Sequence, residues 1–280
     1  MDAAEKFIQQ FKKTKTLPHI VTRLAELIND EDSTLQDFEE VIRMDPALVA
    51  RLLTLVNSSF FGMSRNVDSI SRAVALLGMK NLHNIAVTDA IQGMIDTDIE
   101  TPGFEPKRLW AHSAAVGLCC KMIAERILSI DGDDAYLIGI LHDIGLIVEF
   151  ETARNSFFKI IDQLEPNSPD ILELEQQELE TDHCKIGYLL ALEWQIAHPL
   201  AEAIRDHHLE NYEPTPHSPT AILQIAEYIV NQLGFSLKDD QYSQLSDGLS
   251  AHVQKNIAEY KVLAEDLPEE LEKITSMYGN

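Results

Sequence analysis

The sequence predicts an all-α protein, because apolar residues recur at helical spacing through nearly the whole chain and no segment alternates like a β-strand. The first clear example lies at residues 20–28, where the apolar side chains share one helix face. A second observation is that capping residues and prolines mark where helices start. A third is that short clusters of Pro, Gly and Asp separate the helical stretches.

Three helix starts are marked strongly enough to fix the register of the helices that follow. Ser33 with Gln36 predicts a capping box, in which each side chain bonds the backbone amide of the other residue. The pairs Asp45-Pro46 and Ser218-Pro219 each place an oxygen acceptor before a proline in the first turn. We therefore expect helices to begin directly after these caps.

Further helices follow from the spacing of apolar residues. Gly78 ends the apolar segment at residues 70–77, and the next helix is expected from about Leu82 to Met94. A long apolar helix is expected from about residue 109 to 128, and a short helix ends near His142. The sequence after Gly234 has sparser helical periodicity and forms a C-terminal helical tail.

A breaker cluster at residues 101–106 predicts a boundary between two helical subdomains. The first, residues 1–103, is an N-terminal helical bundle. The second, residues 104–280, is another helical bundle that includes the C-terminal tail. Because the link is short, we expect the two bundles to pack together.

The charge composition of the chain limits the classes of molecule that it is expected to bind. The 280 residues include 22 Lys and Arg against 46 Asp and Glu, a formal net charge of −24, which argues against direct nucleic-acid or anionic-membrane binding. No run approaches the roughly 20 apolar residues of a membrane span, and the start lacks a secretory layout, so we expect a cytoplasmic protein.

The acidic run at residues 173–180 is interpreted as a solvated helix face. The cysteines, Cys119, Cys120 and Cys184, lack the spacing of zinc or disulfide motifs and are interpreted as small buried side chains.

Two stretches of the first bundle carry a family resemblance. They contain Asp45-Pro46-Ala47-Leu48, Asn57-Ser58-Ser59-Phe60-Phe61-Gly62, Val67-Asp68-Ser69-Ile70-Ser71-Arg72-Ala73-Val74 and Leu77-Gly78. Together they resemble the signature of the HDOD family over most of residues 17–95. Gly62 and Gly78 are expected at turns, and Asn57 with Ser58 is interpreted as a helix end satisfied by local hydrogen bonds.

The second bundle is similar to the HD superfamily of metal-dependent phosphohydrolases in the order of its histidines. The resemblance implies an HD-domain, phosphodiesterase-like helical bundle that holds one or two divalent metal ions. The implied metal ligands are His112, His142, Asp143, His183, His207 and His208, with Glu227 standing where the last aspartate ligand is expected.

The residue types support a shared site without the analogy. Each histidine sits among apolar positions, where an unpaired polar group would cost about 1 to 3 kcal/mol, so each ring needs a partner. Imidazole and carboxylate ligands suit iron, manganese, nickel or zinc. Mutual hydrogen bonds or bound water would serve as well, and the sequence leaves these alternatives open.

Departures from the active pattern predict a regulatory protein. Leu146 stands where active relatives commonly have a phosphate-binding lysine, Glu227 replaces an aspartate, and no Gly-Tyr-Pro signature follows His208. The resemblance to HDOD proteins implies a signal transduction module acting through an unidentified protein partner, with a degenerate metal site and no assigned catalytic residue. The alternative is a metal-dependent phosphohydrolase acting on nucleotides or cyclic dinucleotides through the same ligands. A third hypothesis is a site that binds a metal or phosphate ligand and transmits its occupancy without chemistry.

Overall fold

The computed structural model describes residues 2–14, 19–57, 67–95, 104–164, 170–209, 214–238 and 244–275. Within these ranges the chain is helical and contains no β-strand, which confirms the predicted all-α class. None of the helices in this described part is both long and apolar enough to cross a membrane.

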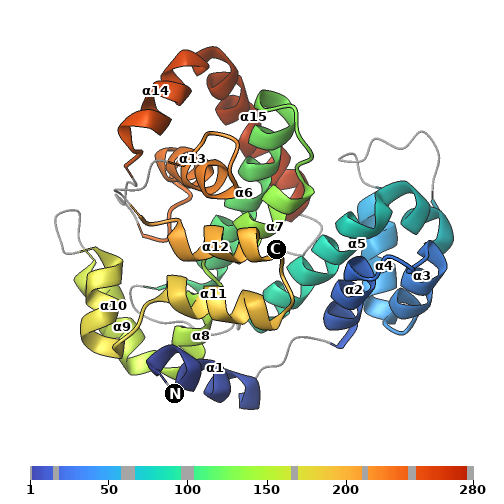
Figure 1. The fold of residues 1–280 in the computed structure, drawn as a ribbon, viewed down its shortest axis with the longest axis horizontal. Coiled ribbons are helices and arrows are strands. Elements are labelled where there is room, and N and C mark those ends of the chain that lie inside the picture. The colour runs from blue at the N-terminus through green and yellow to red at the C-terminus, as the bar shows by residue number, and fades with distance from the viewer. Residues whose placement is uncertain are drawn as a thin grey trace. The chain divides into compact units, whose positions relative to one another are not determined.

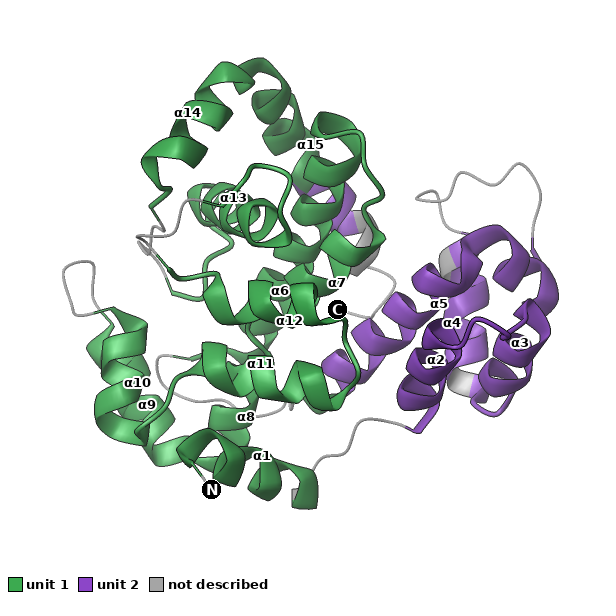
Figure 2. Ribbon diagram, in the orientation of Figure 1, with its two compact units in different colours: residues 1–16, 94–267 green, residues 17–93, 268–280 purple. Residues whose placement is uncertain are grey.

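The chain forms two compact units (Figure 2). The larger comprises residues 1–16 and 94–267, and the smaller comprises residues 17–93 and 268–280. This division differs from the boundary at residue 103 that the breaker cluster predicts. One reason is that α1 (Ala3–Thr14) packs against α8 and α11 of the larger unit, although it opens the chain.

The smaller unit is built from α2 (His19–Asn29), α3 (Leu35–Arg43), α4 (Pro46–Val56) and most of α5 (Ile70–Met94). α2 packs on α3 and α3 on α4. Their apolar faces bury side chains that include Leu24, Phe38 and Leu52. The helical spacing of the sequence therefore produces one buried face per helix, as predicted.

The helix starts of the smaller unit confirm one prediction and correct another. Asp45 caps α4, because its Oδ1 accepts a hydrogen bond from the Leu48 amide at 3.0 Å. The capping box of α3 is formed by Thr34 and Asp37, so the predicted box of Ser33 with Gln36 is wrong by one residue. The Thr34 amide donates to Asp37 Oδ2 at 2.8 Å, which satisfies the free amide at this end.

Two predicted features at the ends of these helices are observed. Gly78 adopts φ 75° inside α5, which breaks the helix there without an intervening loop, so the second part begins before the expected Leu82. Asn57 donates to the carbonyls of Leu53 and Val67, both at 2.7 Å, as the local hydrogen-bond interpretation requires. Ser58 and Gly62 lie outside the described residues.

The larger unit carries the remaining helices (Figure 1). Besides α1 it contains α6 (Pro106–Met122), the π-helical turn η1 (Ile123–Ile127), α7 (Asp133–Leu141), α8 (Ile144–Thr152), α9 (Arg154–Gln163), α10 (Ile171–Leu179), α11 (His183–Glu193), α12 (His198–Asp206), α13 (Pro219–Gln232), α14 (Asp247–Lys255) and the first part of α15 (Ile257–Thr275). α6 packs on α7 and α13, while α11 packs on α8 and α12. Ser218 caps α13 as predicted, since its side chain accepts from the Ala221 amide.

Glycines let two pairs of these helices touch backbone to backbone. A Cβ built on Gly139 of α7 would lie 2.5 Å from the Cα of Gly117 on α6. A Cβ built on Gly145 of α8 would lie 2.0 Å from the carbonyl oxygen of His183 on α11. No other residue type fits at such contacts without moving a helix. These two crossings bring together the helix ends that carry the polar residues described next.

Candidate metal centre

The six histidine and aspartate residues singled out in the sequence converge in the larger unit. His112 lies on α6, His142 and Asp143 form the turn between α7 and α8, His183 opens α11, and His207 with His208 follows α12. All are buried except His208, which is partly exposed. Four helix ends and one helix side therefore supply a single cluster, which we call the candidate metal centre.

Asp143 is the middle of this centre. Its Oδ2 lies 3.2 Å from His142 Nε2 and 3.5 Å from His112 Nε2. Its Oδ1 lies 3.6 Å from His183 Nε2 and 3.7 Å from His207 Nε2. Each oxygen of the Asp143 carboxylate thus faces two imidazole rings.

The opposite ring nitrogens are tied to the protein. In three of the histidines Nδ1 donates its proton to a backbone carbonyl, so the neutral form of each ring carries its lone pair on Nε2. The donors His112, His142 and His207 bond the carbonyls of Phe235, Gly139 and Ile204 at 2.8, 2.8 and 2.7 Å. The rings are therefore oriented with their free nitrogens toward Asp143.

His183 is held by a carboxylate instead. Its Nδ1 donates to Glu175 at 2.8 Å, and its backbone amide donates to the same carboxylate at 3.0 Å. Glu175 is fully buried on α10, so the interpretation of residues 173–180 as a solvated face is wrong at this position. A second buried acid, Glu149 on α8, lies beside Glu175.

Burial and neighbouring charges shift the pKa of Glu149 and the pKa values of residues in the centre itself. Burial, and then repulsion from Glu175, raises the pKa of Glu149 well above its ordinary value. Burial alone would raise the pKa of Asp143, but the surrounding imidazoles, His142 foremost, hold it well below its usual range. Burial lowers the pKa of His112, and burial with the neighbouring imidazoles holds that of His208 well below its ordinary value. A carboxylate whose pKa is held low beside imidazoles whose pKa values are also low is a site for a cation.

His183 and His207 differ from the other histidines. Burial would lower the pKa of each ring, but the neighbouring Cys184, helped by Glu175 at the first ring and Asp143 at the second, raises both pKa values well above the ordinary one. Metal binding at such imidazoles releases their protons, so the affinity depends on pH.

The spacing of the ligand atoms fits a metal ion. Three ligands of a tetrahedral zinc with bonds of about 2.1 Å lie about 3.4 Å apart. The corresponding edges here are 3.2 and 3.5 Å from Asp143 Oδ2, and 3.3 Å between the Nε2 atoms of His112 and His142. In addition, His207 Nε2 is buried without a hydrogen-bond partner. An orphaned imidazole nitrogen aimed at a carboxylate needs a ligand of its own.

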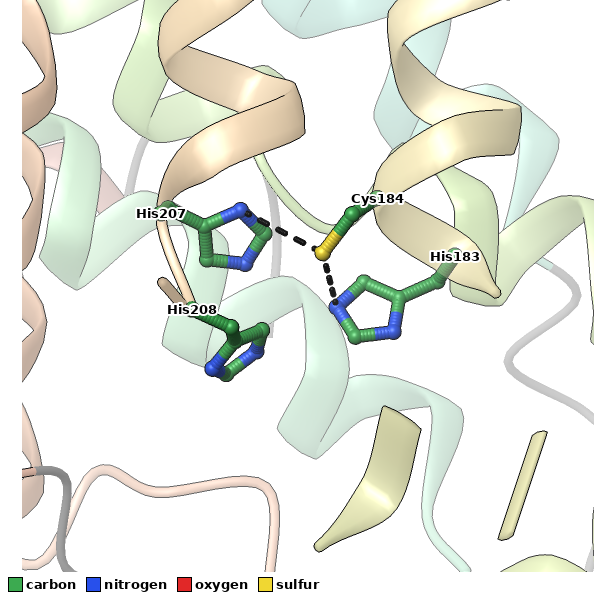
Figure 3. A group of neighbouring side chains, drawn as sticks. All are labelled: His183, Cys184, His207 and His208. Carbon is green, nitrogen blue, oxygen red and sulfur yellow. Dashed lines mark hydrogen bonds between the residues drawn. The ribbon is translucent and has the colours of Figure 1, made fainter. Parts of the chain in front are cut away.

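Sequence reasoning missed Cys184. All three cysteines are buried as predicted, but the Cys184 thiol faces the centre (Figure 3). Its Sγ lies 3.5 Å from His183 Nε2 and 3.7 Å from His207 Nδ1. The adjacency of Cys184 to a predicted histidine ligand was the only signal in the sequence, and neighbours on a helix usually face different directions.

Two of the three departures from the active pattern, Leu146 and Glu227, lie at separate places in the structure, and most of the segment after His208 lies outside the described residues. Leu146 is buried on α8 and brings no charge to the centre. Glu227 is buried on α13, and its negative charge raises the pKa values of His112 and His207 as a minor contribution. Its carboxylate is not part of either group of ligand atoms within 4.8 Å of one another.

The fold and the centre define an all-helical protein with a histidine and aspartate cluster that could hold metal. A sequence model of the HDOD domain matches residues 15–210. The chain therefore belongs to the HDOD domain family. An uncharacterised protein of Treponema pallidum (strain Nichols) is 29% identical over 212 residues, which cover 72% of this chain and 40% of that protein.

Several solved structures are similar to this chain, among them proteins from three bacteria. An HDOD domain protein of unknown function from Geobacter sulfurreducens is 23% identical with a TM-score of 0.72, covering 96% of this chain and 97% of that one. A protein of Shewanella amazonensis SB2B, provisionally named a phosphohydrolase, is 26% identical with a TM-score of 0.72 and coverage of 99% and 98%. A protein of Marinobacter aquaeolei VT8, provisionally named a signal transduction protein, is 20% identical with a TM-score of 0.77 and coverage of 99% and 63%.

Proposed function

We propose that this chain is a regulatory HDOD protein of signal transduction that binds one or two divalent metal ions at the candidate metal centre and acts through a protein partner. The observation that carries metal binding is the convergence of four Nε2 atoms on the two oxygens of Asp143. The residues that would hold the metal are His112, His142, Asp143, His183, His207 and His208. Iron, manganese, nickel and zinc all suit this set.

Burial and charge favour regulation over catalysis. The exposed fractions of His112, His142, Asp143, His183 and His207 are 3, 0, 6, 1 and 3%. A metal ion fits such a centre, but a nucleotide needs a wider opening and a cationic group for its phosphates. Leu146 supplies no cation, and the net charge of −24 repels anions. The same charge favours a protein partner over nucleic acid or a membrane surface.

Metal analysis tests the first half of this proposal. Purified wild-type chain should retain or take up at least one equivalent of metal after stripping with chelator and dialysis against each candidate ion. Asp143→Ala should lose this binding, because it removes the carboxylate that the four Nε2 atoms face. Asp162→Ala, an exposed aspartate on α9, is the matched control and should bind like wild type. Equal binding by the Asp143 variant would refute the assignment.

A second candidate function is metal-dependent hydrolysis of phosphoesters. It is favoured by the division of the imidazoles between the two oxygens of Asp143, since two-metal hydrolases place metals about 3.5–4 Å apart around shared ligands. When bound, such metals activate water and polarise the phosphoester. Assays of metal-loaded protein on nucleotides and cyclic dinucleotides separate the two functions. Turnover abolished by Asp143→Ala would establish the hydrolase, and no turnover is expected from the regulatory protein.

The regulatory half is tested by metal-dependent partner binding. A partner that binds the metal-loaded wild type and the Asp162→Ala variant, but not Asp143→Ala, would connect the centre to signalling. Thermal unfolding with and without metal should accompany it, because a ligand that prefers the folded chain raises the midpoint. A partner that binds all three proteins equally would show that the centre does not control the interaction.

A further inference from the structure

We propose that Cys184 is a thiolate ligand of the candidate metal centre and that, together with His183, it makes the centre prefer zinc to manganese or magnesium. This inference rests on the proposed metal binding and goes beyond the histidine and aspartate ligands. Thiolate is a soft ligand that suits zinc, whereas carboxylate, carbonyl and water suit magnesium and manganese.

The distance between Cys184 and His183 is that of two ligands on one zinc ion. With a zinc–nitrogen bond of about 2.1 Å and a zinc–sulfur bond of about 2.3 Å, tetrahedral ligands lie about 3.6 Å apart. The observed separation of Cys184 Sγ and His183 Nε2 is 3.5 Å. His183 Nε2 is also 3.6 Å from Asp143 Oδ1, so the ring faces the thiol and the carboxylate together.

Other donors complete a coordination set around this pair. The ligand atoms of His183, Cys184, His207 and His208 all lie within 4.8 Å of one another (Figure 3). His207 Nε2 is an independent sign of a ligand, because it is buried and has no hydrogen-bond partner. Imidazole nitrogen and thiolate sulfur are both ligands of zinc, and four of them match its tetrahedral coordination number.

Hydrogen bonds hold the His183 ring with its Nε2 toward the Cys184 thiol. Glu175 accepts the Nδ1 proton, so the neutral form of His183, which binds a metal, carries its lone pair on the nitrogen that faces the thiol. Cys184 itself is 3% exposed in the second position of α11, so its sulfur is shielded from solvent. Cys120, by contrast, lies at 4.0 Å from the carbonyl of Ile222, away from the centre.

The competing explanation is a structural hydrogen bond from the Cys184 thiol to His183. Serine separates the two explanations, because its hydroxyl keeps the size and the hydrogen bond but is a poor zinc ligand. Cys184→Ser is therefore the test variant. Cys119→Ser, the same change at a fully buried cysteine of α6, is the matched control.

The experiment titrates the full chain with cobalt, zinc and manganese. Cobalt-loaded wild type should show sulfur-to-cobalt charge-transfer absorption in the near ultraviolet, and Cys184→Ser should lose it while Cys119→Ser keeps it. Zinc affinity should fall about tenfold or more in Cys184→Ser, with manganese affinity nearly unchanged. A Cys184 variant with the same band and the same ratio of zinc to manganese affinity would overturn the inference.

X-ray absorption of zinc-loaded wild type needs no variant and guards against a misfolded one. It should show a sulfur neighbour at about 2.3 Å, and a shell of nitrogen and oxygen alone would refute the inference. If wild type binds metal without sulfur, only the role of Cys184 fails. If it binds no metal at all, the proposed function fails with it.

Discussion

Replacing Gly145 by alanine should push α8 away from α11. The added Cβ would lie 2.0 Å from the carbonyl oxygen of His183 and 2.6 Å from its carbonyl carbon and its Cα. Because real Cβ atoms essentially never come closer than 3.0 Å to such atoms, the two backbones must separate by at least 1 Å. All three of these atoms belong to the backbone, so no flexible side chain can move aside to make room.

Two losses follow from this displacement. Overpacking of a close contact costs about 1 to 3 kcal/mol of unfolding free energy. Because the displaced residue is His183, its Nε2 moves relative to Asp143 by a distance comparable to half of a metal–nitrogen bond of about 2.1 Å. A site must hold its ligands within about 0.5 Å, so metal affinity should fall by about tenfold or more.

Urea denaturation and metal titration measure these losses. Gly93→Ala is the control, because a Cβ on Gly93 of α5 meets nothing within 4 Å. The same substitution inside a helix should there stabilise the protein by about 0.5 to 1 kcal/mol. We therefore expect Gly145→Ala to lower the free energy of unfolding and Gly93→Ala to raise it. Wild-type stability and metal affinity in Gly145→Ala would refute the steric reasoning.

Three further substitutions test the surroundings of the centre. Wild type should lose stability as the pH rises above about 4.5, because Glu149 ionises there only in the unfolded chain, and each unit of raised pKa is worth about 1.4 kcal/mol. Glu149→Gln should abolish this loss, and the free energies of unfolding at about pH 5 and pH 8 measure it. The same pH dependence in the variant as in wild type would contradict the prediction. Glu175→Gln should weaken metal binding about 10- to 100-fold through the loss of the charge that holds His183, while Glu173→Gln, exposed on the same helix, should not. Asp182→Ala removes the side-chain cap of α11 and should cost about 1 kcal/mol in unfolding free energy, with the midpoint of thermal unfolding as the measure.

Local chemistry explains why the helices could be predicted from the sequence. Periodicity and caps act within a few residues, so the starts of α4 and α13 follow from Asp45 and Ser218 alone. The capping box of α3 shows the limit of this reasoning. Ser33 and Thr34 are both good caps with a suitable acceptor three residues later. Only the hydrogen bonds between Thr34 and Asp37 in the folded chain decide the register.

The residues of the candidate metal centre could be predicted only where their order along the chain resembles that of a known family. The histidines and Asp143 were found in this way, whereas Glu175 and Cys184 were not. An acidic run looks solvated until tertiary packing places one of its members against His183. The placement of α1 in the larger unit was missed for the same reason, since its contacts with α8 and α11 are distant in sequence.

The glycines explain why these residues can meet. Helix axes usually lie about 8–10 Å apart, a distance set by the side chains between them. At Gly139 and Gly145 the interposed side chain is absent, and the helices touch through their backbones. His142 and Asp143 lie between these two glycines, so the turn that carries them is drawn toward α6 on one side and α11 on the other. The centre therefore depends on two glycines that offer no side-chain metal ligand, and its histidines could all be present in a chain that lacks the site.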